Sequence, residues 1–147
     1  MSDHPTDPIS SHLEFLGYES RTTPDGWCFS SHPRRLNLFY KKFPFGWRFH
    51  ASIYLAPSLG DLRSSFLDGV NAINEKSTVV KFTLNRDSDG DFAIRARAIF
   101  QPDYGKKEFG AFMDTWHSDL ELLSELPKVP DVEEDTGSTT EEARAVN

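Results

Sequence analysis

Apolar and polar residues alternate along several segments of this chain, a pattern that indicates β-strands with one buried face. The clearest segment runs from Trp47 to Leu55, where every second side chain is apolar. The intervening positions hold Arg48, His50, Ser52 and Tyr54. Turn residues separate further extended segments, at 18–22, 27–31, 36–43, 78–86 and 91–100. The pattern predicts antiparallel strands that bury one face and leave the other in water.

Three other segments space their apolar residues as amphipathic helices do. The first follows the helix-start pair Asp7-Pro8 and stops at Gly17. The second is expected to begin near Ser58, with Asp61 placed to accept hydrogen bonds from free amides. The last runs over about 105–126 and ends at a proline. The predicted buried stripe of the second helix is Leu59, Leu62, Phe66, Val70 and Ile73.

The order of these elements predicts an α+β fold of the form α-βββ-α-ββ-α. We expect a single twisted antiparallel sheet of about five strands with helices packed on one face. The domain is predicted to span 8–126, after a flexible N-terminus of residues 1–7. Residues 127–147 contain almost no large apolar side chain, so they are predicted to form a disordered acidic tail.

The charge and the cysteine content of the chain limit which classes of function it can have. The formal net charge of -7 disfavours a general attraction to nucleic acid, although a local basic patch is compatible with it. Cys28 is the single cysteine, which excludes an intrachain disulfide and any Cys-pair metal site. No secretory signal and no apolar run of bilayer length is visible, so the expected location is cytoplasmic, with no membrane partner.

Two patterns invite a chemical interpretation, and neither has the required spacing. Asp87-Ser88-Asp89-Gly90-Asp91 alternates carboxylates, but its glycine and closing position do not match an EF-hand loop, so a hairpin turn is favoured. The five histidines show no metal-ligand spacing. His50 shares a strand face with Arg48 and Tyr54, a conceivable acid-base cluster without an orienting carboxylate. No metal and no cofactor is predicted.

Three arginines point away from the apolar sets of their strands. If the strands form one sheet, Arg48, Arg95 and Arg97 are expected to make a basic stripe on its polar face. The stripe could take an acidic partner, the chain's own acidic tail, or nucleic acid. The alternative is a solvated sheet face, because such faces are routinely charged.

The turn Phe43-Pro44-Phe45-Gly46-Trp47 places three rings close together. A turn does not easily bury three rings within its own domain, and an exposed cluster of rings marks an interface. The alternative is that the rings fold back over the rim of the core.

The chain also resembles the type III secretion chaperone-like fold and, within it, the YbjN-type family of small bacterial proteins described as candidate sensory transduction regulators. The resemblance covers most of the chain from Ile9 to Leu126. It implies a small domain that is commonly dimeric and able to hold extended segments of partner proteins. The matching stretches are Leu16-Gly17-Tyr18, 36–43, 70–74, and the hairpin strands 81–84 and 91–94.

Together these observations predict a non-enzymatic protein-binding module, a chaperone or regulatory adaptor that forms a homodimer and binds an effector or a regulatory target. An added strand at a free sheet edge is one expected mode. One alternative is binding of nucleic acid or an acidic ligand on the Arg48, Arg95 and Arg97 face. A less favoured alternative is a small enzyme using His50. The predicted protein-binding residues are Phe43, Phe45, Trp47, Arg48, Arg95 and Arg97.

Overall fold

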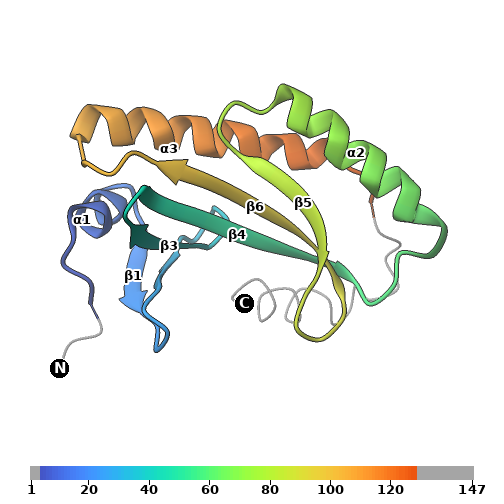
Figure 1. Cartoon of the computed structure of the whole chain (residues 1–147), viewed down its shortest axis with the longest axis horizontal. Coiled ribbons are helices and arrows are strands. Elements are labelled where there is room, and N and C mark those ends of the chain that lie inside the picture. Colours follow the sequence, from blue (N-terminus) through green and yellow to red (C-terminus); the bar gives the residue numbers. More distant parts are fainter. Residues whose placement is uncertain (1–3, 129–147) are drawn as a thin grey trace.

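The computed structural model describes residues 4–128, and it confirms the predicted α+β fold (Figure 1). The sheet has six antiparallel strands where the sequence predicted about five, and their order is β1-β2-β3-β4-β6-β5. The strands are β1 (Glu19–Thr22), β2 (Cys28–Ser31), β3 (Leu38–Phe43), β4 (Gly46–Ala56), β5 (Lys81–Arg86) and β6 (Phe92–Phe100). The helices are α1 (Pro8–Phe15), α2 (Arg63–Lys76) and α3 (Lys106–Leu120), with 3₁₀ turns at Gly60–Leu62 and Glu121–Glu125.

The ends of the helices agree with the sequence in one case and differ in another. Asp7 caps α1, because its side chain accepts a hydrogen bond from the amide of Ser10. The second helix does not begin at Ser58 with a capping Asp61. Its first turn is the 3₁₀ segment, the α-helix starts at Arg63, and neither start has a side-chain cap.

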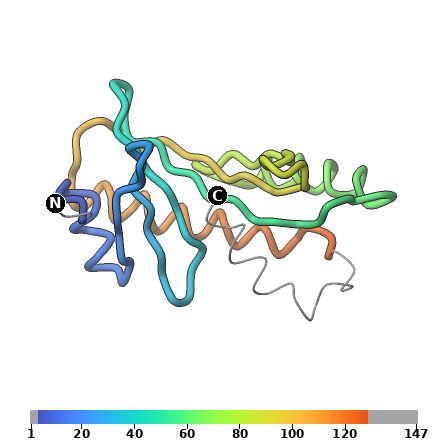
Figure 2. Tube along the Cα trace, turned by 90° about the horizontal axis from the view of Figure 1, so that it is seen from below, coloured from blue at the N-terminus to red at the C-terminus, as the bar shows by residue number. Residues whose placement is uncertain are grey.

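The sheet twists strongly, and α3 lies along one side of β4 and β6 (Figure 2). The alternation in β4 explains this arrangement, since Phe49 and Ala51 point toward the helix and are buried. Rings fill the interface: the Phe49 centroid lies 5.1 Å from that of Phe112 and 6.2 Å from that of Trp116. Burial of such large side chains supplies most of the stabilisation of this layer.

A glycine allows the tight turn between β3 and β4. Gly46 has φ +146°, and a side chain at this position would collide with the carbonyl oxygen of Phe100 on β6. The turn therefore brings the backbone of β4 against β6 at a distance that only glycine permits.

Helix α2 closes one edge of the sheet. The side-chain amide of Asn74 donates to the carbonyl oxygen of Phe82 at 2.9 Å and accepts from its amide at 2.8 Å. These are two of the outward-facing backbone groups of β5 that a further strand would use, and Asn74 satisfies both of them. Helix α2 thus covers the β5 edge at Phe82.

A buried carboxylate ties α3 to the segment that enters β5. Asp119 is 4% exposed and accepts hydrogen bonds from the amides of Thr78, Val79 and Val80, at distances of 2.7–3.0 Å. Three consecutive amides around one carboxylate form strong charge-assisted bonds. This contact fixes where the chain leaves α2 and begins β5.

Several sequence predictions concern residues beyond the described range. Residues 1–3 of the expected flexible N-terminus, and 129–147 of the expected acidic tail, lie outside it, so both predictions stand as made. Within residues 4–128, no helix has the length and apolar character needed to cross a membrane.

Replacing the buried carboxylate tests this account of the fold. Asp119→Ala should lower the free energy of unfolding by about 3 kcal/mol, because buried amides lose a charged acceptor. Asp119→Asn, which keeps one accepting oxygen, should lose less. The matched control is the exposed Asp114→Ala on the same helix, expected to stay within about 0.5 kcal/mol of the parent. Urea unfolding measures all three variants, and equal losses at positions 119 and 114 would contradict the assignment.

Candidate functional site

Helices α1 and α3 cover one face of the sheet, and the opposite face, which we call the open sheet face, has no helix packed on it within residues 4–128. The strand alternation decides which side chains it carries, and they are a mixture of rings and cations. Its members are Phe29, Phe39, Lys41, Phe43, Lys81, Thr83, Arg48, His50, Ser52, Tyr54, Arg95, Arg97 and Ile99.

The strand register brings the three predicted arginines together. His50 of β4 lies opposite Arg97 of β6, and Ser52 lies opposite Arg95. Arg48 stands two residues before His50 on the same side of β4, between Lys41 and Ile99 on the neighbouring strands. Positions two apart on a strand are about 7 Å apart, so the three guanidinium groups share one region of the face.

Rings form a continuous stripe beside these cations. His50 stacks on Phe39 with centroids 5.1 Å apart and meets the edge of Trp27 at 4.9 Å. The stripe continues through Phe43 to Phe45, whose rings stack at 5.3 Å. We call this set the aromatic stripe; its members are Phe29, Phe39, His50, Trp27, Phe43 and Phe45.

Cationic side chains lie over several of these rings. The Arg48 guanidinium carbon is 5.7 Å from the centroid of Phe43, and that of Arg21 is 5.1 Å from Phe29. The Lys41 ammonium is 5.8 Å from the centroid of Phe43 and also of Trp27. Such cation–π contacts hold charged groups in place on the face without neutralising them.

The electrostatics of His50 reflect this concentration of positive charge. Burial lowers its pKa to about 4, and the nearby Arg95, Arg48 and Arg97 act in the same direction, against a smaller opposite effect of Asp25. The ring is therefore neutral at pH 7. His50 Nδ1 and Arg95 Nε are buried and have no hydrogen-bond partner within residues 4–128. Nor does any of the three arginines form an ion pair with a carboxylate of that range.

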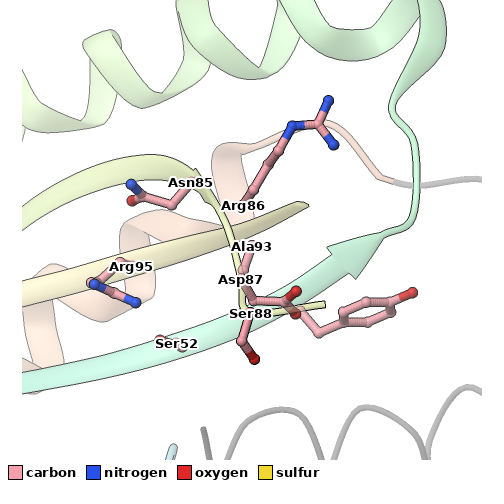
Figure 3. Close-up of a pocket in the computed structure, with 8 residues that line it drawn as sticks. Ser52, Asn85, Arg86, Asp87, Ser88, Ala93 and Arg95 are labelled. Carbon is pink, nitrogen blue, oxygen red and sulfur yellow. The ribbon is translucent and has the colours of Figure 1, made fainter. Parts of the chain in front are cut away.

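A shallow pocket of about 160 Å³ opens on the same face, between β4, β6 and the β5–β6 hairpin (Figure 3). Figure 3 shows Arg95 and Ser52 on neighbouring strands, with Asp87 and Ser88 at the far end of the hollow. A pocket of this size is smaller than the roughly 300–1,000 Å³ of usual small-molecule sites. It suits a side chain of a larger ligand. His50 does not line this pocket, and its Nδ1 has no hydrogen-bond partner in residues 4–128, so no carboxylate orients it as an acid or base.

The structure separates the three rings of the predicted aromatic turn. Phe43 and Phe45 lie on the open side, and Phe45 is 51% exposed. Trp47 turns to the covered face, where it is 8% exposed and its Nε1 donates to the carbonyl oxygen of Pro102 at 3.2 Å. Trp47 is therefore a core residue at the rim, while Phe43 belongs to the open sheet face and Phe45, in the turn, extends the aromatic stripe.

Sequence reasoning missed part of this surface. Trp27, Phe29 and Phe39 join the aromatic stripe from β2 and β3 and the turn before β2. In the sequence these rings alternate with Cys28, Ser30 and Leu38, which indicates that they share one face of their strands. Which face this is follows only from the register of β2 against β3.

Two other polar clusters are structural. In the β5–β6 hairpin, Asp87 accepts hydrogen bonds from the amides of Asp89 and Asp91, as the predicted turn requires. The three carboxylates lie within 4.8 Å of one another and have the chemistry of cation ligands, yet Asp87 already serves the turn.

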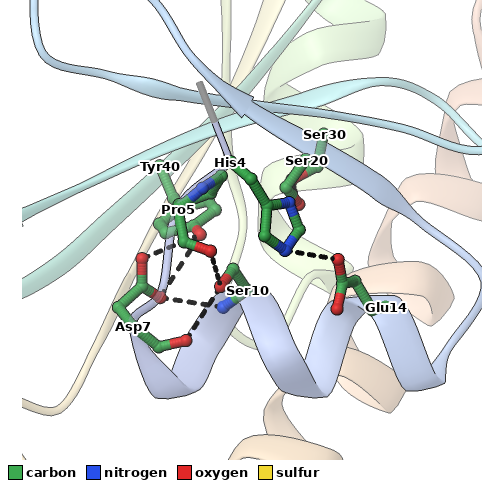
Figure 4. Close-up of polar contacts among 8 residues, drawn as sticks. All are labelled: His4, Pro5, Asp7, Ser10, Glu14, Ser20, Ser30 and Tyr40. Carbon is green, nitrogen blue, oxygen red and sulfur yellow. Dashed lines mark hydrogen bonds and ion pairs between the residues drawn. The ribbon is translucent and has the colours of Figure 1, made fainter. Parts of the chain in front are cut away.

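At the start of α1, Asp7 accepts from the Tyr40 hydroxyl as well as from the Ser10 amide, so this acid anchors the helix to β3 (Figure 4). Nearby, the hydroxyls of Ser20 and Ser30 bond to each other at 2.6 Å. His4 pairs with Glu14 at 2.9 Å on the outer side of the helix. These contacts position the helix against β1 and β3.

Comparison with known proteins confirms the fold. The structure is similar to the crystal structure of YbjN from E. coli, described as a candidate transcription regulator, with a TM-score of 0.63 over 82% of this chain and 90% of that chain. The sequence identity is 15%. No family model and no curated protein sequence matches the chain. The predicted resemblance to the YbjN-type fold is thus correct, and at this identity it shows the fold alone.

The arginine cluster makes a specific prediction about His50. Replacing both strand arginines, Arg95→Gln and Arg97→Gln, should raise the His50 pKa from about 4 toward its ordinary value, because two repelling charges are removed. The control Lys106→Gln with Lys107→Gln removes the same charge from exposed positions on α3 and should leave it unchanged. Titration of the His50 ring by NMR measures the shift.

The lowered pKa of His50 also determines how the free energy of unfolding changes with pH. The unfolded chain protonates this histidine near pH 6.5 and the folded chain only near pH 4, so the stabilisation present above pH 6.5 is lost as the pH falls through that window. An unchanged titration in the arginine variant would show that burial alone sets the pKa.

Proposed function

We propose that this protein is a non-enzymatic binding module that holds an acidic, partly apolar segment of a partner protein on its open sheet face. The observation that carries the proposal is the meeting of the aromatic stripe with three arginines that have no carboxylate partner in residues 4–128. Rings offer apolar contact, and guanidinium groups bind carboxylates with two parallel hydrogen bonds. An extended peptide with alternating acidic and apolar side chains satisfies both.

The arrangement of the sheet favours this surface over the other predicted modes. At the β5 edge, Asn74 of α2 already bonds both backbone groups of Phe82, which an added strand would need. The open sheet face presents Ile99, which is 56% exposed and lies opposite Arg48, and Phe45 in the β3–β4 turn is 51% exposed and stacks on Phe43. Exposed rings and aliphatic groups next to arginine are typical of protein interfaces.

Binding of nucleic acid is the second candidate, because single-strand binding proteins also combine rings with cations on a sheet. Two observations make it the weaker one. The rings of the stripe stack and edge against one another, and Phe29 is 7% exposed, so few ring faces are available to bases. The chain as a whole carries -7, which repels a phosphate backbone.

The more specific parts of the proposal concern the role of the protein, its oligomeric state and its location. A regulatory adaptor or chaperone acts by holding a partner segment, and the similarity to YbjN, itself described as a candidate transcription regulator, is compatible with that role. The proposal includes no cofactor and no catalytic step. A homodimer in the cytoplasm belongs to it as well, and light scattering of the full chain tests the dimer; a strict monomer at high concentration would remove it.

A direct binding measurement tests the proposed function. The probe is a fluorescent twelve-residue peptide in which Glu and Leu alternate, compared with a labelled oligo-thymidine of twelve nucleotides. The peptide should bind the full chain, and Arg95→Gln with Arg97→Gln should weaken it at least tenfold, since two charged hydrogen-bond partners are lost. Fluorescence anisotropy at fixed ionic strength gives both dissociation constants.

The control is again Lys106→Gln with Lys107→Gln, which changes the net charge equally and should leave peptide affinity within about twofold. Tighter binding of the oligonucleotide than of the peptide, with the same loss in the arginine variant, would transfer the function to nucleic acid. Absence of binding by both probes would reject the open sheet face as a site for extended acidic ligands.

A further inference from the structure

The C-terminal segment of this chain has the chemistry that the open sheet face lacks. Residues 129–147 contain six carboxylate side chains and one guanidinium, a net side-chain charge of -5. Four of the six fall within 131–135, next to Val132. The open sheet face, in contrast, gathers arginines without carboxylate partners in residues 4–128. The two parts of the chain are complementary in charge.

The described chain ends at one end of the sheet, on the side that the helices cover. Leu126 packs against the small cluster that contains Ala56 and Phe92, the last residue of β4 and the first of β6. Pro127 follows beside Gly69 of α2. The chain therefore leaves the fold at the end of the sheet where β4 finishes and β6 begins, and the pocket with Arg95 opens at this same end.

The distances allow a short return onto the face. Phe92 and Arg95 are three residues apart on β6, which is about 10 Å. The first acidic residue, Asp131, is five residues beyond Leu126, a reach of up to about 17 Å, and the whole segment can extend over about 65 Å. An extended segment entering past the sheet end would meet Arg95 first, then Arg97 and Arg48.

We propose that the acidic segment 129–147 binds the open sheet face of its own chain, with the carboxylates of 131–135 on Arg95, Arg97 and Arg48, and so competes with the partner segment. This inference rests on the proposed function, because it names an internal competitor for the same site. Buried Arg95 Nε, which lacks a partner in residues 4–128, is a donor that such a carboxylate would satisfy.

Tethering makes even weak binding effective. A short linker gives an effective concentration on the order of 1 mM. If the segment binds the face with a dissociation constant on the order of 0.1 mM, the face is closed about nine-tenths of the time, and an external ligand binds about tenfold more weakly. A second copy of the chain would need to reach the same concentration in solution to compete.

The test uses the full chain and the same Glu-Leu peptide as probe. The tail variant carries Asp131→Asn, Glu133→Gln, Glu134→Gln and Asp135→Asn. It should bind the peptide about tenfold more tightly than the parent, and the gain should disappear near 1 M salt, where charges are screened beyond about 3 Å. The control variant changes four exposed acids on or beside α2 and α3, which are Asp61, Asp68, Glu75 and Glu121, to their amides, and it should show no such gain.

A second readout does not depend on the peptide. The NMR signals of Arg95 Nε–H and of the His50 ring should move when the tail variant is compared with the parent, and stay in place in the control variant. Equal peptide affinity together with unmoved signals would overturn the inference while leaving the proposed function intact. If neither form binds the peptide, the proposed function fails and the NMR comparison alone decides the inference.

Protein concentration separates the two sources of the segment. Signal shifts that are constant on dilution support binding within one chain. Shifts that vanish on dilution would show that the segment binds a neighbouring copy, and would overturn the intramolecular assignment.

Discussion

The contact between Asp119 and the amides of three consecutive residues ties α3 to the segment that enters β5. It joins the end of α3, which covers the sheet, to the point where α2 gives way to β5. Helices α1 and α3 pack on one face, and Asn74 holds α2 at the β5 edge, so each of the three helices already has its place. No helix of residues 4–128 remains for the opposite face, and that face is open as a consequence of how the covered one is secured.

The chain is acidic overall, but its open sheet face is cationic, so acidic and basic side chains lie in different regions. Net charge describes the average, and the chain's -7 argues against binding to polyanions in general. Recognition depends on the local field, and around Arg95 and Arg97 this field adds to the effect of burial in lowering the pKa of His50. Most of the net charge belongs to residues 129–147, which carry -5, so the rest of the chain is close to neutral and its positive charges can act locally.

The sequence predicted those features that depend on local periodicity. The alternation in β4 correctly placed Phe49 toward the core and His50 away from it, and the same rule placed Arg95 and Arg97 on one face of β6. What it could not supply was register between strands. The stacking of His50 on Phe39 depends on the pairing of β3 with β4, which a tight glycine turn determines. Trp47 shows the limit most clearly, since the alternation assigns it to the core and its place in an aromatic turn suggested an interface.

The neutrality of His50 has a physical role in this surface. A protonated imidazole among three arginines would add repulsion that weakens the fold, and its burial adds a desolvation cost to that charge. As a neutral ring it stacks on Phe39 and extends the apolar stripe up to the arginines. The positive charge of the face is then carried by guanidinium and ammonium groups, which stay protonated throughout the physiological range. The face therefore keeps the same charge over that range.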